Sequence, residues 1–264
     1  MLQPVNSLTG KRILLTRAAD QCEAIAELIA QRGAKTLCFP CLAVQCLSEN
    51  IRHGLSALPE NTAILLSSVN GVSCAAKALG DDFVPLFSRH QVIAVGSQTA
   101  AALTERGISV AWIASEASQE GLIQGFAEHG LPASVYFLRA EEGRDVLQQA
   151  LQNQGAEVHL IHAYRTICPQ GDAADTAQAL ERGEIDAVLL GSSRTARHYV
   201  QRIGNAQLAN RPAVVVISAQ VAAAAEGAGL SVQAVAKEAS FAAMLDALAE
   251  YFEETRSVTE ENRP

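Results

Sequence analysis

The sequence predicts an α/β protein with two parallel sheets, each covered by helices on both faces. Strand and helix signals alternate along the whole chain of 264 residues, and this order is typical of parallel sheets. The apolar content is 49%, mostly aliphatic, with only 5% aromatic residues, which favours helices packed on parallel strands over a sandwich or barrel. The same order of signals then occurs a second time, so we expect two domains of ordinary size.

The first half of the chain is predicted to begin with a strand at Arg12–Thr16. A helix follows, for which Asp20 and Glu23 form a capping box and Gly33 is the stop signal. The next strand covers Thr36–Phe39. Three further strands are expected at Ala63–Leu66, Val92–Val95 and Ser109–Ile113, and their helices begin at Ser67-Ser68, Gly96-Ser97 and Ser118.

The second half repeats the first in register. Five residues recur with the same type at a spacing of 122 (139 − 17): Arg17, Gly33, Ala34, Gly107 and Ser118 recur as Arg139, Gly155, Ala156, Gly229 and Ser240. The strand Ala63–Leu66 corresponds to Ala187–Leu190 at a spacing of 124 (187 − 63). Matching caps, strands and order indicate an internal duplication. We therefore expect two similar three-layer, flavodoxin-like domains of about five strands each.

One extended stretch, Val158–Thr166, differs from the other strands. It follows a helix that ends on Gly155 and continues without a turn signal into Tyr164, after which the composition changes abruptly. We expect it to be a connector that forms one wall of a cleft between the two domains.

The residues that follow the strands are the candidate binding residues, because ligands of parallel α/β sheets bind beyond the carboxyl ends of the strands. They are small hydroxyls, amides, helix N-termini and two repeated arginines. Helix N-termini offer unpaired N–H donors to carboxylates or phosphates. Any single serine here could be only a helix cap, but the set indicates an anion site. The candidates are Arg17, Ser67, Ser68, Asn70, Gly96, Ser97, Thr99, Arg139, Ser192, Ser193, Ser218 and Gln220.

Charge and missing motifs argue against several functions. The net charge of −8 and the pI near 5.3 disfavour nucleic acid as a partner. No apolar run approaches the roughly 18 residues that span a bilayer, and the N-terminus lacks the order of a secretory signal, so we expect a cytoplasmic protein without a membrane partner. No glycine-rich nucleotide loop and no metal-ligand spacing of the six histidines is present, so no cofactor or metal is expected.

The six cysteines do not make a disulfide scaffold in a chain of this length. Cys38 and Cys41 have the spacing of a redox dithiol motif. Such a motif normally lies at the start of a helix, whose N-terminus lowers the thiol pKa. The residues after Cys41 indicate extended chain instead. Two small buried thiols are the preferred interpretation, and a redox protein remains an alternative.

Six short motifs follow one another in a recognisable order: Ile13–Arg17, Leu65–Val72, Ala94–Ala100, Arg139–Arg144, Ala163–Thr166 and Leu190–Ser193. Together they resemble the uroporphyrinogen-III synthase family over nearly the whole chain. The resemblance implies a cofactor-free cytoplasmic monomer that turns hydroxymethylbilane, a linear tetrapyrrole with eight carboxylates, into uroporphyrinogen III with loss of water and inversion of ring D. It also implies that the substrate is held in the cleft between the domains.

The resemblance further implies a discontinuous domain of residues 1–39 and 167–264. A second domain would cover residues 42–161, and a two-stranded β connector would consist of residues 40–45 and 162–166. Within this connector, Tyr164 is the candidate acid that helps the substrate hydroxyl to leave, because no histidine or carboxylate of the matched motifs competes with it.

One departure from the family concerns the turn at Ser218–Val221, where the family usually has a threonine at the last position. Binding there would depend on backbone N–H groups or on Gln220. The alternative function, from another class, is a non-catalytic two-domain protein that binds or senses a small anion. The same helix N-termini would serve it.

Overall fold

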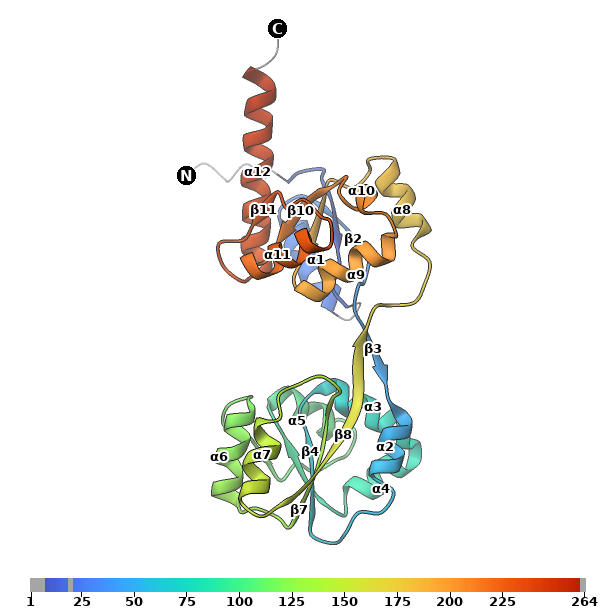
Figure 1. Cartoon of the computed structure of the whole chain (residues 1–264), viewed down its shortest axis with the longest axis vertical. Coiled ribbons are helices and arrows are strands. Elements are labelled where there is room, and N and C mark those ends of the chain that lie inside the picture. The colour runs from blue at the N-terminus through green and yellow to red at the C-terminus, as the bar shows by residue number, and fades with distance from the viewer. Residues whose placement is uncertain (1–7, 19–20, 262–264) are drawn as a thin grey trace. The chain divides into compact units, whose positions relative to one another are not determined.

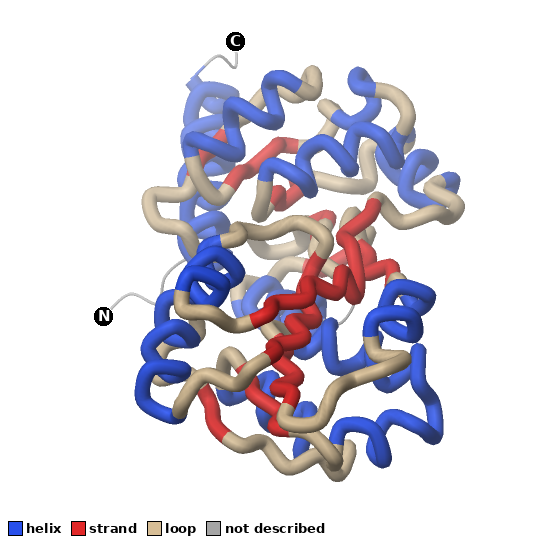
Figure 2. The backbone as a smooth tube through the Cα atoms, turned by 60° about the horizontal axis from the view of Figure 1, so that its bottom comes forward, coloured by secondary structure: helices blue, strands red, loops and turns tan. Residues whose placement is uncertain are grey.

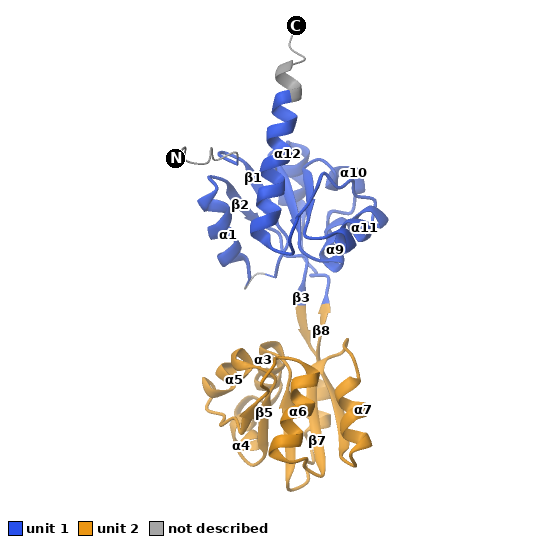
Figure 3. Cartoon of the chain, turned by 90° about the vertical axis from the view of Figure 1, so that its left-hand side faces the viewer, with its two compact units in different colours: residues 1–43, 167–264 blue, residues 44–166 orange. Residues whose placement is uncertain are grey.

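The computed structural model of the chain describes residues 8–18 and 21–261. The chain divides into two compact units, one of residues 1–43 and 167–264 and one of residues 44–166 (Figures 1 and 3). Each unit is built on its own sheet, and strands lie between layers of helices in Figure 2. The predicted fold class of two similar α/β domains is thus confirmed, with one fully parallel sheet and one mixed sheet.

The first unit has a five-stranded parallel sheet in the order β11-β10-β9-β1-β2. Its strands alternate their side chains between two apolar layers, as the pleat requires: Leu14 of β1 faces one layer, whereas Ile13 and Leu15 face the other. The strands are β1 (Arg12–Leu15), β2 (Lys35–Cys38), β9 (Ala187–Leu190), β10 (Ala213–Val216) and β11 (Ala234–Val235).

Two sets of helices cover this sheet. Helices α1 (Cys22–Gln31) and α12 (Phe241–Glu261) pack on one face, and α8 (Ala174–Glu181), α9 (Ser193–Ile203), α10 (Ala206–Ala209) and α11 (Ala219–Gly227) pack on the other. Of the capping box predicted for α1, Asp20 lies outside the described residues. The residue before α1, Gln21, makes no side-chain capping bond.

The second unit has a six-stranded sheet in the order β3-β8-β7-β4-β5-β6. The strands are β3 (Ala43–Cys46), β4 (Thr62–Leu66), β5 (Gln91–Ala94), β6 (Trp112–Ile113), β7 (Ser134–Ala140) and β8 (Glu157–Ile167). The bonds of Leu47 to Ala163 and of Arg165 to Gln45 show that β3 runs antiparallel to β8, and the other neighbours are parallel. The strand expected at Ser109–Ile113 is shorter than predicted.

Two helical layers complete this unit. Helices α6 (Gln119–His129) and α7 (Val146–Asn153) cover one face of the sheet. The other face is covered by α2 (Ser48–Gly54), α3 (Val69–Leu79), α4 (Phe83–Phe87) and α5 (Ser97–Thr104), with the 3-10 turn η2 (Gly80–Asp82) between α3 and α4. The second unit thus has the same three layers as the first.

The duplication in the sequence reappears in the strand orders. At the predicted spacings, β1, β2, β9, β10 and β11 correspond to β7, β8, β4, β5 and β6, and each set lies in the same order in its sheet. Each unit combines the first two strands of one copy with the last three strands of the other. The central pairing of each sheet joins the copies, since Ile13 lies opposite Ala187 and Thr62 opposite Ser134.

This exchange predicts how fragments of the chain behave. Residues 43–167 hold all strands of the second unit's sheet, so we expect them to unfold cooperatively on their own. Residues 168–264 lack β1 and β2 and leave β9 with an unpaired edge, so they should not. Urea unfolding followed by circular dichroism tests both, and adding a peptide of residues 8–42 to the second fragment should restore structure. A cooperative transition of residues 168–264 alone would contradict the expectation.

Candidate active site

A pocket of about 260 Å³ in the second unit contains three of the predicted site residues, Ser67, Arg139 and Tyr164. It lies beyond the carboxyl ends of β4 and β7, where a parallel sheet offers its ligand site. Its lining comes from the ends of β4, β5, β7 and β8, the N-terminus of α6 and the loop before α7: Ser67, Val95, Ala117, Ser118, Gln119, Leu122, Phe137, Arg139, Ala140, Glu142, Gly143, Arg144 and Tyr164.

The side chain of Tyr164 is held at one wall of this pocket. The pairing of β7 with β8 shifts register after Arg139, so that Tyr164 lies opposite Ala140, and such irregularities re-aim side chains. The tyrosine is 8% exposed, and its hydroxyl lies 2.8 Å from Oγ of Ser68. Ser68 caps helix α3 and accepts the N–H of Gly71 at 3.1 Å. The phenol is therefore held in one direction at a helix N-terminus.

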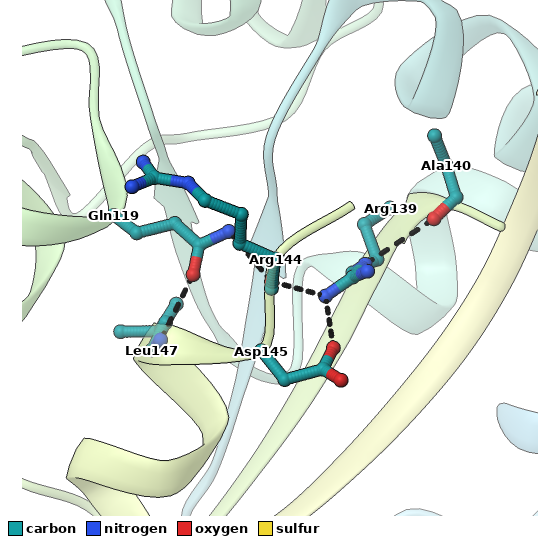
Figure 4. Close-up of polar contacts among 6 residues, drawn as sticks. All are labelled: Gln119, Arg139, Ala140, Arg144, Asp145 and Leu147. Carbon is teal, nitrogen blue, oxygen red and sulfur yellow. Dashed lines mark hydrogen bonds and ion pairs between the residues drawn. The ribbon is translucent and has the colours of Figure 1, made fainter. Parts of the chain in front are cut away.

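Arg139 also lines the pocket, but its donors point mainly into the protein. The residue is 5% exposed. Its Nη1 donates to the carbonyl oxygen of Arg144 at 2.7 Å and to the carboxylate of Asp145 at 2.9 Å, and its Nε donates to the carbonyl of Ala140 at 3.2 Å (Figure 4). The substrate contact predicted for Arg139 stays a prediction. The bonds observed give it a second task, which is to hold the loop after β7.

Gln119 holds the same loop from the other side. Its Nε2 donates to the carbonyl oxygen of Arg144 at 2.8 Å, and its Oε1 accepts the N–H of Leu147 at 2.9 Å (Figure 4). A Cβ at Gly143 would lie 2.7 Å from Nη2 of Arg139, so a larger residue here would have to displace the end of the Arg139 side chain. Arg144 and Gln119 were not predicted as site residues. The sequence did contain a signal for Arg144, because this residue is the last one of the matched motif Arg139–Arg144.

Three other predicted residues of this unit lie at helix N-termini. Asn70 and Ser97 are exposed in the first turns of α3 and α5, and Gly96 caps α5 in an extended conformation. Thr99, by contrast, is only 4% exposed. A contact of Thr99 with a substrate would therefore depend on its backbone.

In the first unit, four predicted residues follow strands β9 and β10. Ser192 forms a capping box with Thr195 at the start of α9, and Ser218 caps α11 by accepting the N–H of Val221 at 3.4 Å. Ser193 and Gln220 stand in the first turns of these helices. That these residues and those of the second unit serve one cleft stays a prediction.

Arg17 and Val221 complete the predicted set. Arg17 follows β1, donates to the side chain of Gln21, and lies with its guanidinium carbon 5.7 Å from the ring centre of Phe241. Val221 is 5% exposed and is the counterpart of Thr99 in the repeat (99 + 122 = 221). Because both side chains pack into the core, the missing hydroxyl of Val221 removes no group from the surface.

The cysteines follow the sequence interpretation only in part. Cys46 of β3 and Cys74 of α3 form a disulfide that was not predicted. Cys41 is buried as expected, and burial raises the pKa of its thiol to about 12. Cys38 is exposed, so the prediction of a buried thiol was wrong for this residue. A thiol held protonated in this way does not favour redox chemistry at the Cys38–Cys41 motif.

Within residues 8–18 and 21–261, no three histidine, cysteine or acidic side chains gather as metal ligands. In the same part of the chain, no helix has both the length and the apolar content to cross a membrane.

Comparison with known proteins identifies the family. The family model described as "Uroporphyrinogen-III synthase HemD" matches residues 23–246. The uroporphyrinogen-III synthase of Synechococcus elongatus is 30% identical over 198 residues, which cover 74% of this chain and 75% of that protein. A putative uroporphyrinogen-III synthase of Methanothermobacter thermautotrophicus is 26% identical over 196 residues, covering 72% of this chain and 77% of that protein.

A solved structure supports the fold. The crystal structure of uroporphyrinogen-III synthetase from Helicobacter pylori matches with a TM-score of 0.56 at 17% identity, and covers 91% of this chain and 99% of that chain. The family assignment itself depends on the sequence matches, because the family model spans most of the chain and the Synechococcus relative matches about three quarters of it. The chain therefore belongs to the uroporphyrinogen-III synthase family.

Proposed function

We propose that this chain cyclises hydroxymethylbilane to uroporphyrinogen III with loss of water and inversion of ring D, and so acts as a carbon–oxygen lyase. The observation that carries the proposal is the Tyr164 hydroxyl, held 2.8 Å from Ser68 at one wall of a pocket in a chain of this family. A volume of about 260 Å³ is smaller than the usual pocket for a whole ligand of drug size. The pocket therefore suits one part of the substrate.

The first chemical step is departure of the hydroxyl group from the substrate's terminal hydroxymethyl carbon. Ser68 accepts the N–H of Gly71 and has one proton left to donate, which it can give to the phenol oxygen of Tyr164. The phenol proton is then free to point at the leaving oxygen. The phenol O–H is a hydrogen-bond donor, so it can act as a general acid.

In this step the carbon–oxygen bond breaks and the oxygen leaves as water with the proton of Tyr164. The electron pair of the pyrrole nitrogen replaces the lost bond and gives a cationic azafulvene. Closure with inversion then exchanges the bonds of ring D: the methylene carbon of the azafulvene bonds to the ring D carbon that carries the bridge from ring C, that bridge bond breaks, and the bridge carbon bonds to the free α-carbon of ring D. The proton lost from this α-carbon restores the phenol. The atoms balance with one water lost and no external reagent.

The remaining task is to hold the flexible substrate in one folded conformation. Without an enzyme the chain of four rings can close head to tail without inversion. Helix N-termini such as those of α3, α5, α9 and α11 can bind carboxylates through free N–H groups. Fixing the reacting ends by several such contacts lowers the entropic barrier to one closure over the other.

We also propose that the protein acts as a cytoplasmic monomer on this small substrate, without a cofactor. The support for this is the family pattern. The net charge of −8 makes nucleic acid an unsuitable partner. Size-exclusion chromatography with light scattering would test the monomer, for which we expect a mass near 27.9 kDa.

The direct test of the proposed function is the identity of the product. The protein is incubated with enzymatically generated hydroxymethylbilane, and the oxidised uroporphyrin isomers are separated and compared with a buffer-only reaction. We expect isomer III to predominate and to form faster than any product in buffer. Isomer I alone, at the buffer rate, would refute the proposal and favour the alternative, a non-catalytic protein that binds or senses a small anion.

Salt is expected to weaken substrate binding. Charges on the substrate would be held by helix N-termini and arginines despite the net charge of −8, and in about 0.5 M salt the screening length falls to roughly 4 Å. KM should therefore rise several-fold between 0.05 and 0.5 M sodium chloride while kcat changes less. A KM indifferent to salt over this range would argue against carboxylate binding by these groups.

A further inference from the structure

Arg144 is the cationic side chain of the pocket that remains accessible. It lines the pocket together with Ser67, Ser118 and Tyr164, and its side chain is 66% exposed. Arg139, the other arginine of the lining, is 5% exposed and bonded within the protein. We propose that Arg144 binds one carboxylate of the substrate, and that Arg139 is a positioning residue for it. This inference rests on the proposed function.

The backbone of Arg144 is anchored by hydrogen bonds, and a rigid backbone favours ligand binding by the side chain. Its carbonyl oxygen accepts two hydrogen bonds, from Nη1 of Arg139 at 2.7 Å and from Nε2 of Gln119 at 2.8 Å (Figure 4). The next residue, Asp145, is paired with the same Nη1 of Arg139 at 2.9 Å. The loop is thus anchored to strand β7 and helix α6 while the guanidinium extends from it. A rigid base of this kind lowers the entropy lost when a ligand binds.

The guanidinium of Arg144 already contacts a carboxylate. Its Nη1 and Nη2 lie 3.1 and 3.4 Å from the two carboxylate oxygens of Glu120 in the first turn of α6. Both side chains are more than half exposed, at 66% and 54%, and an ion pair in such a position is weak. The geometry is that of the two-pronged bond by which arginine recognises carboxylates. A substrate carboxylate can therefore replace Glu120 on Arg144.

The test compares four variants by KM, kcat and melting temperature. Arg144→Gln is expected to raise KM about tenfold or more, because a charge-assisted hydrogen bond is lost, with kcat within about twofold of the parent value. The KM of Arg144→Lys should lie between that of the parent protein and that of Arg144→Gln, since lysine keeps the charge without the two-pronged geometry. Glu120→Gln should lower KM about twofold, because the competing carboxylate is gone.

Arg182→Gln is the matched control. Arg182 is an exposed arginine at 65%, and it pairs with Glu184 at 3.7 Å outside the pocket lining. Its KM should stay at the parent value. If Arg144→Gln behaves like Arg182→Gln, or if Glu120→Gln raises KM as much as Arg144→Gln does, Arg144 serves only the structural pair and the inference is overturned.

The two proposals fail in different ways. If the parent protein makes isomer III and Arg144→Gln keeps the parent KM, only the role of Arg144 is refuted. If the parent protein makes isomer I alone at the buffer rate, the proposed function and this inference are refuted together. Should Arg144→Gln melt well below the parent protein, the fall in KM of Glu120→Gln decides, because that variant keeps Arg144 in place.

Discussion

Replacing Tyr164 by phenylalanine is expected to lower kcat about a hundredfold and to leave the protein folded. General acid catalysis contributes roughly 10²–10⁴-fold, and we expect the low end because the pyrrole nitrogen of the substrate already helps to expel the hydroxyl. The substitution removes only the oxygen that lies 2.8 Å from Ser68, so the ring still fills its place in the core of the second unit. Slower departure of water should also let more isomer I escape.

The measurement is kcat with hydroxymethylbilane together with the ratio of isomers III and I. Tyr136→Phe is a matched control, because Tyr136 is a buried tyrosine of the same sheet that does not line the pocket. Ser68→Ala should lower kcat less, since it removes the partner of the phenol and not the phenol itself. A Tyr164→Phe variant with the parent rate and the parent isomer ratio would rule out the acid role.

Breaking the disulfide between Cys46 and Cys74 is expected to lower the free energy of unfolding of the second unit by about 3.5 kcal/mol. The bond closes a segment between residues 28 apart and ties β3 to α3. Without it the unfolded chain gains the conformational freedom of that loop. Because stabilities of domains are only about 5–15 kcal/mol, a loss of this size should be obvious.

Urea unfolding with and without a reductant measures this effect. The double variant Cys46→Ser with Cys74→Ala should have the stability of the reduced protein, and it is the control because the reductant should no longer change its midpoint. Equal midpoints of the parent protein in both conditions would contradict the expected stabilisation.

The layered fold was predictable because its signals are local. Strands such as β9 and β10 are short runs of buried aliphatic residues, and serine caps start the helices that follow them. The spacing of these signals also predicted the duplication. Signals at element ends were less reliable: the strand expected at Ser109–Ile113 is limited to Trp112–Ile113. The length of a strand at an exposed end depends on whether a neighbouring strand pairs with it, and a local sequence pattern does not predict that pairing.

Local sequence patterns did not determine which strands pair with one another, because the pairing depends on the whole chain. Ala63–Leu66 and Ala187–Leu190 are equally suitable neighbours for β1 by composition, yet β1 pairs with the copy 174 residues away (187 − 13). The motifs led to the discontinuous arrangement only through the family resemblance. The physical reason is that two copies with the same apolar pattern offer the same local energy, so only packing of the complete sheet distinguishes them.

The sequence by itself determined which chemical groups follow the strands: hydroxyls, amides, helix N-termini and arginines. Only the tertiary structure decided which of them are accessible. Arg139 and Arg144 are the same residue type in one motif, but the first is buried against Asp145 and the second is exposed in the pocket. Accessibility depends on the register of β7 with β8 and on the fold of the loop that follows. Both are set by contacts between segments far apart in the chain.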